Sequence, residues 1–80
     1  MAKEIRIGKK SKNKYVQACL YSFDNNESPV VVAALGSQIS KAFDVAERVG
    51  KTLENVEEID TETFEKDNLQ GVRITLEGEK

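Results

Sequence analysis

The chain has 80 residues, the length of one small domain, and its 39% apolar and 32% charged residues indicate a folded, soluble protein. Its charges are unevenly distributed: residues 1–14 hold six cations against one carboxylate, whereas residues 54–80 hold three cations against nine carboxylates. Histidine is absent, which excludes the side chain most often used as a general base and as a transition-metal ligand.

The first half of the chain predicts a strand, a helix and a second strand. Residues 3–7 alternate polar and apolar side chains, and Gly8 ends this strand. Ser11 is a candidate N-cap for the helix that follows. A turn cluster over 24–29 ends the helix, and a β-branched run over 30–35 predicts a central strand. The apolar face of the helix is formed by Tyr15, Val16, Cys19, Leu20 and Phe23.

The second half predicts another helix and two further strands. Gly36 ends the central strand, and either Ser37 or Ser40 is a candidate cap for the helix. Gly50 lies in or near the last turn of that helix. Its apolar face is formed by Ile39, Ala42, Phe43, Ala46, Val49 and Leu53.

The remaining residues alternate as strands do. We expect a strand over 56–64 with a bulge near Glu57 and Glu58, a polar loop over 65–71 and a regular strand over 72–77. The order β-α-β-α-β-β predicts a single α/β domain over 1–80, an α+β sandwich whose four-stranded mixed sheet carries two helices on one face.

The sequence also sets expectations about location. No segment approaches the roughly 20 apolar residues of a membrane span, and the N-terminus lacks the apolar region of a signal peptide. The single cysteine, Cys19, cannot form an internal disulfide, which agrees with a reducing compartment. We therefore expect a cytoplasmic protein with no membrane partner.

No catalytic constellation is recognisable. The serines lack a histidine to act as their base, and the paired carboxylates are typical of solvated strand edges. Cys19 lies on the apolar face of the first helix, which favours a core residue over a thiolate nucleophile. The phosphate-binding pattern G-x-x-x-x-G-K-[ST] is absent. We predict a protein that is not an enzyme and uses no cofactor or metal.

One segment does indicate chemistry, the lysine-rich turn over 7–14. Lys9 and Lys10 directly follow a strand and directly precede a helix N-terminus, where backbone N–H groups are unpaired and the helix dipole is positive. This arrangement predicts an anion site. The alternative interpretation is a basic loop that is simply solvated.

Two segments resemble motifs of the Alba family, archaeal dimeric chromatin proteins that bind DNA and RNA. Residues 7–10 read Ile-Gly-Lys-Lys, and residues 13–16 resemble the family's Asn-Tyr-Val triplet, interrupted here by Lys14. Residues 36–44, Gly-Ser-Gln-Ile-Ser-Lys-Ala-Phe-Asp, look like the family's G-x-x-I-S-K-A-x-D helix start. The resemblance covers essentially the whole chain and implies the fold of the C-terminal domain of translation initiation factor three.

The resemblance also implies a function and a set of binding residues. It implies a homodimer, paired through the second helix and the last strands, that binds the backbone of DNA or RNA and associates with the chromosome if DNA is bound. Lys9 and Lys10 match the family's phosphate-binding lysines, and Lys41 matches the lysine of the second helix start. The predicted nucleic-acid-binding residues are Lys9, Lys10, Lys12, Lys14 and Lys41.

The chain departs from the family pattern in ways that predict weak binding. Leu35 and Ser37 replace arginines that flank the glycine of the second turn, and the hairpin over 61–71 reads as short and acidic, with three carboxylates and one lysine. Fewer cations and added carboxylates lower affinity for phosphates. The alternative is a family member that has lost nucleic-acid binding and uses the acidic hairpin and Leu35 as a surface for a protein partner.

Overall fold

The computed structural model describes residues 3–78, and the two outermost residues at each end of the predicted 1–80 domain lie outside the described residues. The predicted β-α-β-α-β-β order and four-stranded mixed sheet are confirmed. The elements are β1 (Lys3–Arg6), α1 (Lys12–Asp24), β2 (Val30–Leu35), the 3₁₀ helix η1 (Gly36–Gln38), α2 (Ile39–Thr52), β3 (Val56–Lys66) and β4 (Leu69–Gly78).

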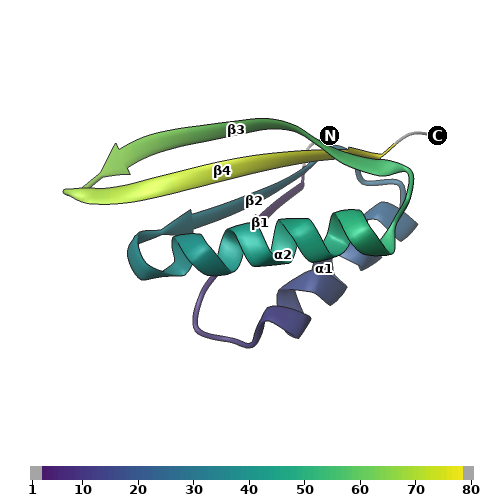
Figure 1. Ribbon diagram of the computed structural model, residues 1–80, viewed down its shortest axis with the longest axis horizontal. Coiled ribbons are helices and arrows are strands. Elements are labelled where there is room, and N and C mark those ends of the chain that lie inside the picture. Colours follow the sequence, from purple (N-terminus) through teal and green to yellow (C-terminus); the bar gives the residue numbers. More distant parts are fainter. Residues whose placement is uncertain (1–2, 79–80) are drawn as a thin grey trace.

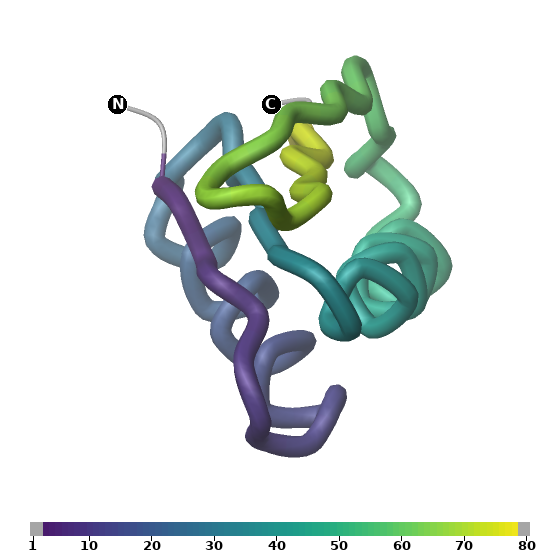
Figure 2. The backbone as a smooth tube through the Cα atoms, turned by 90° about the vertical axis from the view of Figure 1, so that its left-hand side faces the viewer, coloured from purple at the N-terminus to yellow at the C-terminus, as the bar shows by residue number. Residues whose placement is uncertain are grey.

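The sheet has the strand order β1-β2-β4-β3, with β1 and β2 parallel and the other neighbours antiparallel. Because parallel strands need a crossover, α1 connects β1 to β2. Both helices cover the same face of the sheet, so the opposite face is open (Figures 1 and 2). Within residues 3–78, neither helix has the length and apolar character of a membrane span.

The core lies between the helices and the covered face of the sheet. From β4, Val72, Ile74 and Leu76 are almost completely buried and alternate with exposed or half-exposed residues, as the pattern predicts. Cys19 of α1 is fully buried, which confirms that it is a core residue. Burying a side chain of the Val or Leu class stabilises a fold by about 1.5–3 kcal/mol. From α2 the core receives Ala42, Val45, Ala46 and Val49.

The predicted helix caps are only partly confirmed. Ser11 occupies the N-cap position of α1, but its side chain makes no capping hydrogen bond. Neither Ser37 nor Ser40 caps α2, whose N-cap is Gln38. The reason lies in η1: Gly36 has a φ of +57°, which starts a tight 3₁₀ turn, so the chain is already wound where α2 begins.

The last two strands are longer than predicted. The expected loop over 65–71 is wrong, because β3 extends to Lys66 and β4 begins at Leu69. The connection is the two-residue turn of Asp67 and Asn68, with φ values of +51° and +65°. Asp and Asn tolerate this left-handed backbone better than most residues, and such turns join strands directly. The hairpin is therefore a long arm rather than a short one. Its acidic composition is as predicted.

The predicted bulge in β3 is confirmed one residue further along the chain. The pairing of β3 with β4 shifts between Glu58 and Asp60, which leaves Ile59 as the extra residue. Ile59 is half-exposed although it is a large apolar residue. A bulge increases the local twist of a strand, and here it lies at the base of the long arm.

Candidate nucleic-acid interface

The lysine-rich turn connects β1 to α1 and lies at one end of the molecule. Three connections lie in the left half of Figure 1: the lysine-rich turn, η1 between β2 and α2 and, projecting well beyond both, the tip of the β3–β4 hairpin. They lie far apart along the chain, and the first two are brought together because β1 and β2 run parallel and end at the same edge of the sheet.

The phenol of Tyr15 fixes the lysine-rich turn from its N–H side. The backbone N–H groups of Gly8 and Lys10 both donate to its hydroxyl oxygen, at 2.8 and 3.2 Å. A Cβ atom on Gly8 would lie 3.1 Å from this oxygen, so glycine permits the close approach. Both N–H groups precede Ser11, the N-cap of α1, so the expectation about the N–H groups of the helix N-terminus stays a prediction.

The ring of Tyr15 packs against the core, which agrees with the prediction that it is a core residue rather than a platform for base stacking. Its hydroxyl adds a role that the sequence did not reveal. A half-buried tyrosine normally finds a partner for its hydroxyl, and here both partners belong to the turn. The turn is thus attached to the core through one side chain.

The ammonium group of Lys41 fixes the same turn from its carbonyl side. Its Nζ donates to the carbonyl oxygen of Gly8 at 2.8 Å and to that of Lys10 at 3.0 Å. Lys41 belongs to the first turn of α2 and is half-buried. Two of its three N–H protons are therefore directed at the protein, and the third remains for an external acceptor.

The other predicted lysines differ in whether their ammonium groups form ion pairs within the protein. Lys12 forms an ion pair with Asp44 of α2 at 2.6 Å, both side chains being about half-exposed. Exposed pairs of this kind contribute only about 0–1 kcal/mol, so a phosphate can compete for the lysine. Over residues 3–78, Lys9, Lys10 and Lys14 are exposed and form no ion pair. These three side chains are the accessible cations of the turn.

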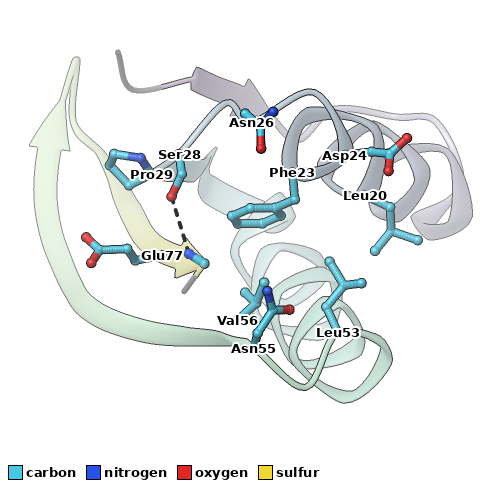
Figure 3. A pocket seen from close by; sticks show the side chains of 11 residues that line it. Leu20, Phe23, Asp24, Asn26, Ser28, Pro29, Leu53, Asn55, Val56 and Glu77 are labelled. Atoms are coloured by element: carbon cyan, nitrogen blue, oxygen red, sulfur yellow. Dashed lines mark hydrogen bonds between the residues drawn. The ribbon is translucent and has the colours of Figure 1, made fainter. Parts of the chain in front are cut away.

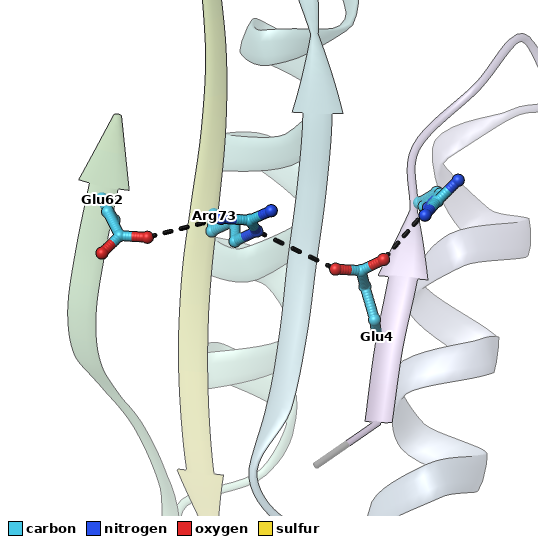
Figure 4. A network of polar contacts seen from close by, with 4 residues as sticks. Glu4, Glu62 and Arg73 are labelled. Atoms are coloured by element: carbon cyan, nitrogen blue, oxygen red, sulfur yellow. Dashed lines mark hydrogen bonds and ion pairs between the residues drawn. The ribbon is translucent and has the colours of Figure 1, made fainter. Parts of the chain in front are cut away.

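The open face of the sheet holds a second set of charges. Arg73 of β4 lies between two carboxylates, with N–O distances of 3.5 Å to Glu62 and 3.9 Å to Glu4, and Arg6 pairs with Glu4 at 3.0 Å (Figure 4). The charges alternate across the sheet, so the row is neutral as a whole. The structure thus reveals charged residues on this face that sequence reasoning did not include in a site.

Apolar side chains cover the hairpin near its tip. A Cβ atom on Gly71 would lie 2.4 Å from the ring of Phe64 and 2.9 Å from a methyl group of Leu35, so both side chains lie over this glycine. The guanidinium carbon of Arg73 is 4.6 Å from the centre of the Phe64 ring. Leu35 therefore has a contact within the chain that explains its apolar character.

A separate hollow lies at the opposite end of the molecule, between the C-terminal ends of both helices and the last residues of β4 (Figure 3). Phe23, Leu53 and Val56 contribute apolar surface, and the hydroxyl of Ser28 accepts a hydrogen bond from the N–H of Gly78 at 3.3 Å. None of the predicted binding lysines lines this hollow.

Comparison with known proteins agrees with this geometry. The family model for Alba matches residues 3–67. Proteins named DNA/RNA-binding protein Alba from Thermoplasma volcanium and Thermoplasma acidophilum are each 39% identical to the chain, covering 95% of it and 98% of their own length. One with the same name from Nanoarchaeum equitans is 34% identical, over 91% of this chain and 94% of its own. These names describe nucleic-acid binding and no enzymatic activity.

Solved structures agree as well. The structure of Alba from Thermoplasma volcanium superimposes with a TM-score of 0.78 at 32% identity, covering 92% of this chain and 98% of the other. ALBA1 from Trypanosoma brucei shares the fold, with a TM-score of 0.85 at 24% identity, covering 94% of this chain and 68% of the other. The lysine-rich turn, the matched segment and the fold together establish that the chain belongs to the Alba family.

Proposed function

We propose that the protein is a non-catalytic homodimer that binds the phosphate backbone of DNA or RNA through its lysine-rich turn, more weakly than basic members of its family. The supporting observation is the attachment of this turn to Tyr15 and Lys41, which leaves Lys9, Lys10 and Lys14 exposed. A turn held on both sides presents its cations with little further ordering on binding.

The five predicted lysines are expected to play different roles in phosphate binding, because their contacts within the protein differ. Lys9, Lys10 and Lys14 make the primary phosphate contacts, and Lys12 joins them when a phosphate displaces Asp44. Lys41 contributes its remaining N–H proton and its positive charge from behind the turn. If DNA is the ligand, the protein is cytoplasmic and associated with the chromosome.

Weak binding follows from the hairpin arm. The arm carries Glu62, Glu65 and Asp67 against Lys66, and it extends from the same end of the molecule as the lysine-rich turn. Carboxylates near a phosphate backbone repel it, and each phosphate that the protein does not neutralise lowers the salt slope of binding to duplex DNA by about 0.9. A basic member of the family lacks this repulsion.

Homodimer formation is supported by exposed apolar residues on two neighbouring elements. Phe43 of α2 and Ile59 of β3 are 42% and 49% exposed, although both are large and apolar. An interface over α2 and β3 covers them and adds buried apolar surface to a domain with a small core. Sedimentation of the wild type and of Phe43→Ser tests this: a dimer is expected for the first and a shift toward the 8.9 kDa monomer for the second. A monomeric wild type contradicts the dimer.

The alternative function, a protein-interaction module that no longer binds nucleic acid, has less support. It depends on Leu35 as an apolar contact for a partner, and part of that side chain already covers Gly71, although 36% of the residue stays exposed. The acidic arm remains compatible with a basic partner.

Fluorescence anisotropy with labelled duplex DNA and RNA at about 50 mM salt tests the proposed function. We expect saturable binding below about 10 μM, within the range of sequence-independent binding. Lys9→Ala/Lys10→Ala weakens it, whereas Lys3→Ala/Lys51→Ala, which removes two exposed cations outside the turn, serves as the control for net charge. No binding at tens of micromolar contradicts the proposal and leaves the protein-interaction module.

A further inference from the structure

A groove of about 250 Å³ lies on the open face of the sheet, beside the row of charges shown in Figure 4. It is lined by β1, β2, η1 and both strands of the hairpin. Its volume is slightly below the roughly 300–1,000 Å³ of sites that enclose drug-sized molecules. The groove therefore suits one flat fragment rather than a larger ligand.

The floor of the groove is apolar and partly aromatic. Ala33 and Leu35 of β2 line it together with Phe64, whose ring is held over Gly71. Arg73 also lines it, and its guanidinium lies over the Phe64 ring at 4.6 Å from the ring centre. Aromatic rings and guanidinium planes are the two protein surfaces on which nucleobases stack.

The rim of the groove carries an amide and four charged side chains, of which Arg6, Lys66 and Arg73 are cations and Glu4, the ion-pair partner of Arg6, is a carboxylate. Lys66 lines it and has no ion pair within the described part of the chain, and Arg6 lies on the other side. Gln38 supplies an amide that can both donate and accept a hydrogen bond, as the edge of a base requires. The rim is thus complementary to a base that is linked to phosphates.

The groove is continuous with the lysine-rich turn. Ile7 lines the groove, and Gly8, the next residue of the turn, follows it directly in the chain. The chain that follows β1 is still hydrogen-bonded to β2 at Ile7, whose N–H donates to the carbonyl oxygen of Ala33 at 2.8 Å. One bound strand can therefore contact the turn and the groove together.

We propose that this groove binds an unstacked base of a single-stranded nucleic acid whose phosphates lie on the lysine-rich turn. The inference rests on the proposed function and refines it. In a duplex the bases are paired and stacked, so a base reaches such a groove only after being unpaired, which costs free energy. The groove consequently favours single strands over duplexes.

The experiment compares a labelled oligouridylate of about twelve nucleotides with a duplex of the same length, by anisotropy at about 50 mM salt. Phe64→Leu keeps an apolar cover over Gly71 but removes the aromatic ring, and Lys66→Gln removes the cation of an exposed side chain. Lys51→Gln, on the outer surface of α2, is the matched control. Thermal unfolding establishes that each variant is folded.

We expect Phe64→Leu to weaken oligouridylate binding by about fivefold or more, the lower end of a stacked base's contribution, while duplex binding stays within about twofold. Lys66→Gln weakens oligouridylate binding more than Lys51→Gln does. The inference is overturned if both groove variants bind oligouridylate like the wild type while Lys9→Ala/Lys10→Ala does not; the proposed function then survives. A wild type that binds neither nucleic acid overturns both.

If Phe64→Leu fails to fold, Lys66→Gln decides the question alone, because Lys66 is exposed and its removal leaves the core intact. A wild type that binds the duplex as tightly as the single strand also contradicts the inference, since the groove then gives no preference.

Discussion

The ammonium group of Lys41 donates a 2.8 Å hydrogen bond to the carbonyl oxygen of Gly8, a residue 33 positions earlier in the chain. Its second hydrogen bond, to Lys10, closes the carbonyl side of a turn whose N–H side is closed by Tyr15. The lysine-rich turn is therefore a fixed structure with a polar clamp on each side. The backbone groups of Gly8 and Lys10 are paired within the protein, while the side chains of Lys9, Lys10 and Lys14 are exposed.

The Tyr15 hydroxyl is the first part of this clamp that can be tested. We expect Tyr15→Phe to lower the free energy of unfolding by about 1–3 kcal/mol, because the N–H of Gly8 loses its acceptor at a part-buried position and the N–H of Lys10 loses it at an exposed one. Tyr21→Phe is the matched control, since Tyr21 is 68% exposed. Urea denaturation measures both, and equal effects in the two variants would show that the hydroxyl does not stabilise the turn.

The Lys41 ammonium group is the second part of the clamp on the lysine-rich turn. Lys41→Met keeps the aliphatic stem but removes both hydrogen bonds to the turn, so we expect faster amide hydrogen exchange in the lysine-rich turn and a decrease of about 1–2 kcal/mol in stability. We also expect nucleic-acid binding to weaken more than in Lys51→Met, which removes the same charge without touching the turn. If the two variants bind equally, Lys41 acts only through its charge.

Alanine substitutions at two glycines, Gly71 of the hairpin arm and Gly50 of α2, are expected to change the stability in opposite directions. Gly71→Ala places a methyl group 2.4 Å from the Phe64 ring, so we expect it to cost about 1–3 kcal/mol and to displace that ring. Gly50→Ala lies within α2, and its Cβ atom meets nothing within 4 Å, so we expect a gain of about 0.5–1 kcal/mol. Thermal unfolding of the two variants compares them directly; a neutral Gly71→Ala would mean that the ring does not rest on the glycine.

Cys19 gives a prediction about alkaline pH. Burial raises the pKa of its thiol from 9.0 to about 11. Because the folded-state pKa lies above the unfolded one, this contribution to stability is complete below about pH 9 and is lost as the pH rises toward 11, a decrease of about 2–3 kcal/mol. Urea denaturation between about pH 8 and 11 measures it. Cys19→Ala should show a smaller alkaline decrease than the wild type; identical decreases would contradict the assignment.

Much of the fold could be predicted because local patterns dominate it. The run over Val30–Leu35 predicted β2 with its bounds, and the apolar face from Ile39 to Leu53 predicted α2, although neither predicted cap is its N-cap. The end of the hairpin could not be predicted, because Leu69, Gln70 and Gly71 resemble a loop in composition. They form a strand because Asp67 and Asn68 reverse the chain in two residues and Phe64 covers the glycine.

The candidate site was predictable only in part. The lysines were identifiable from their position between a strand and a helix, which is local information. The clamp was not, since Lys41 reaches Gly8 only after β2 and α2 are placed beside the turn. The groove could not be predicted from the sequence either, because Arg6, Phe64 and Arg73 come from three strands that only the sheet brings together.

The most direct test of the central claim is the salt dependence of binding to duplex DNA. Binding constants of the wild type, Lys9→Ala and Lys51→Ala are measured between about 50 and 200 mM salt, and the logarithm of each constant is plotted against that of the salt concentration. We predict that Lys9→Ala lowers the slope by about 0.9 for each phosphate that it no longer neutralises, while Lys51→Ala leaves the slope unchanged. Equal slopes for the wild type and Lys9→Ala would contradict the claim that the lysine-rich turn binds the phosphate backbone.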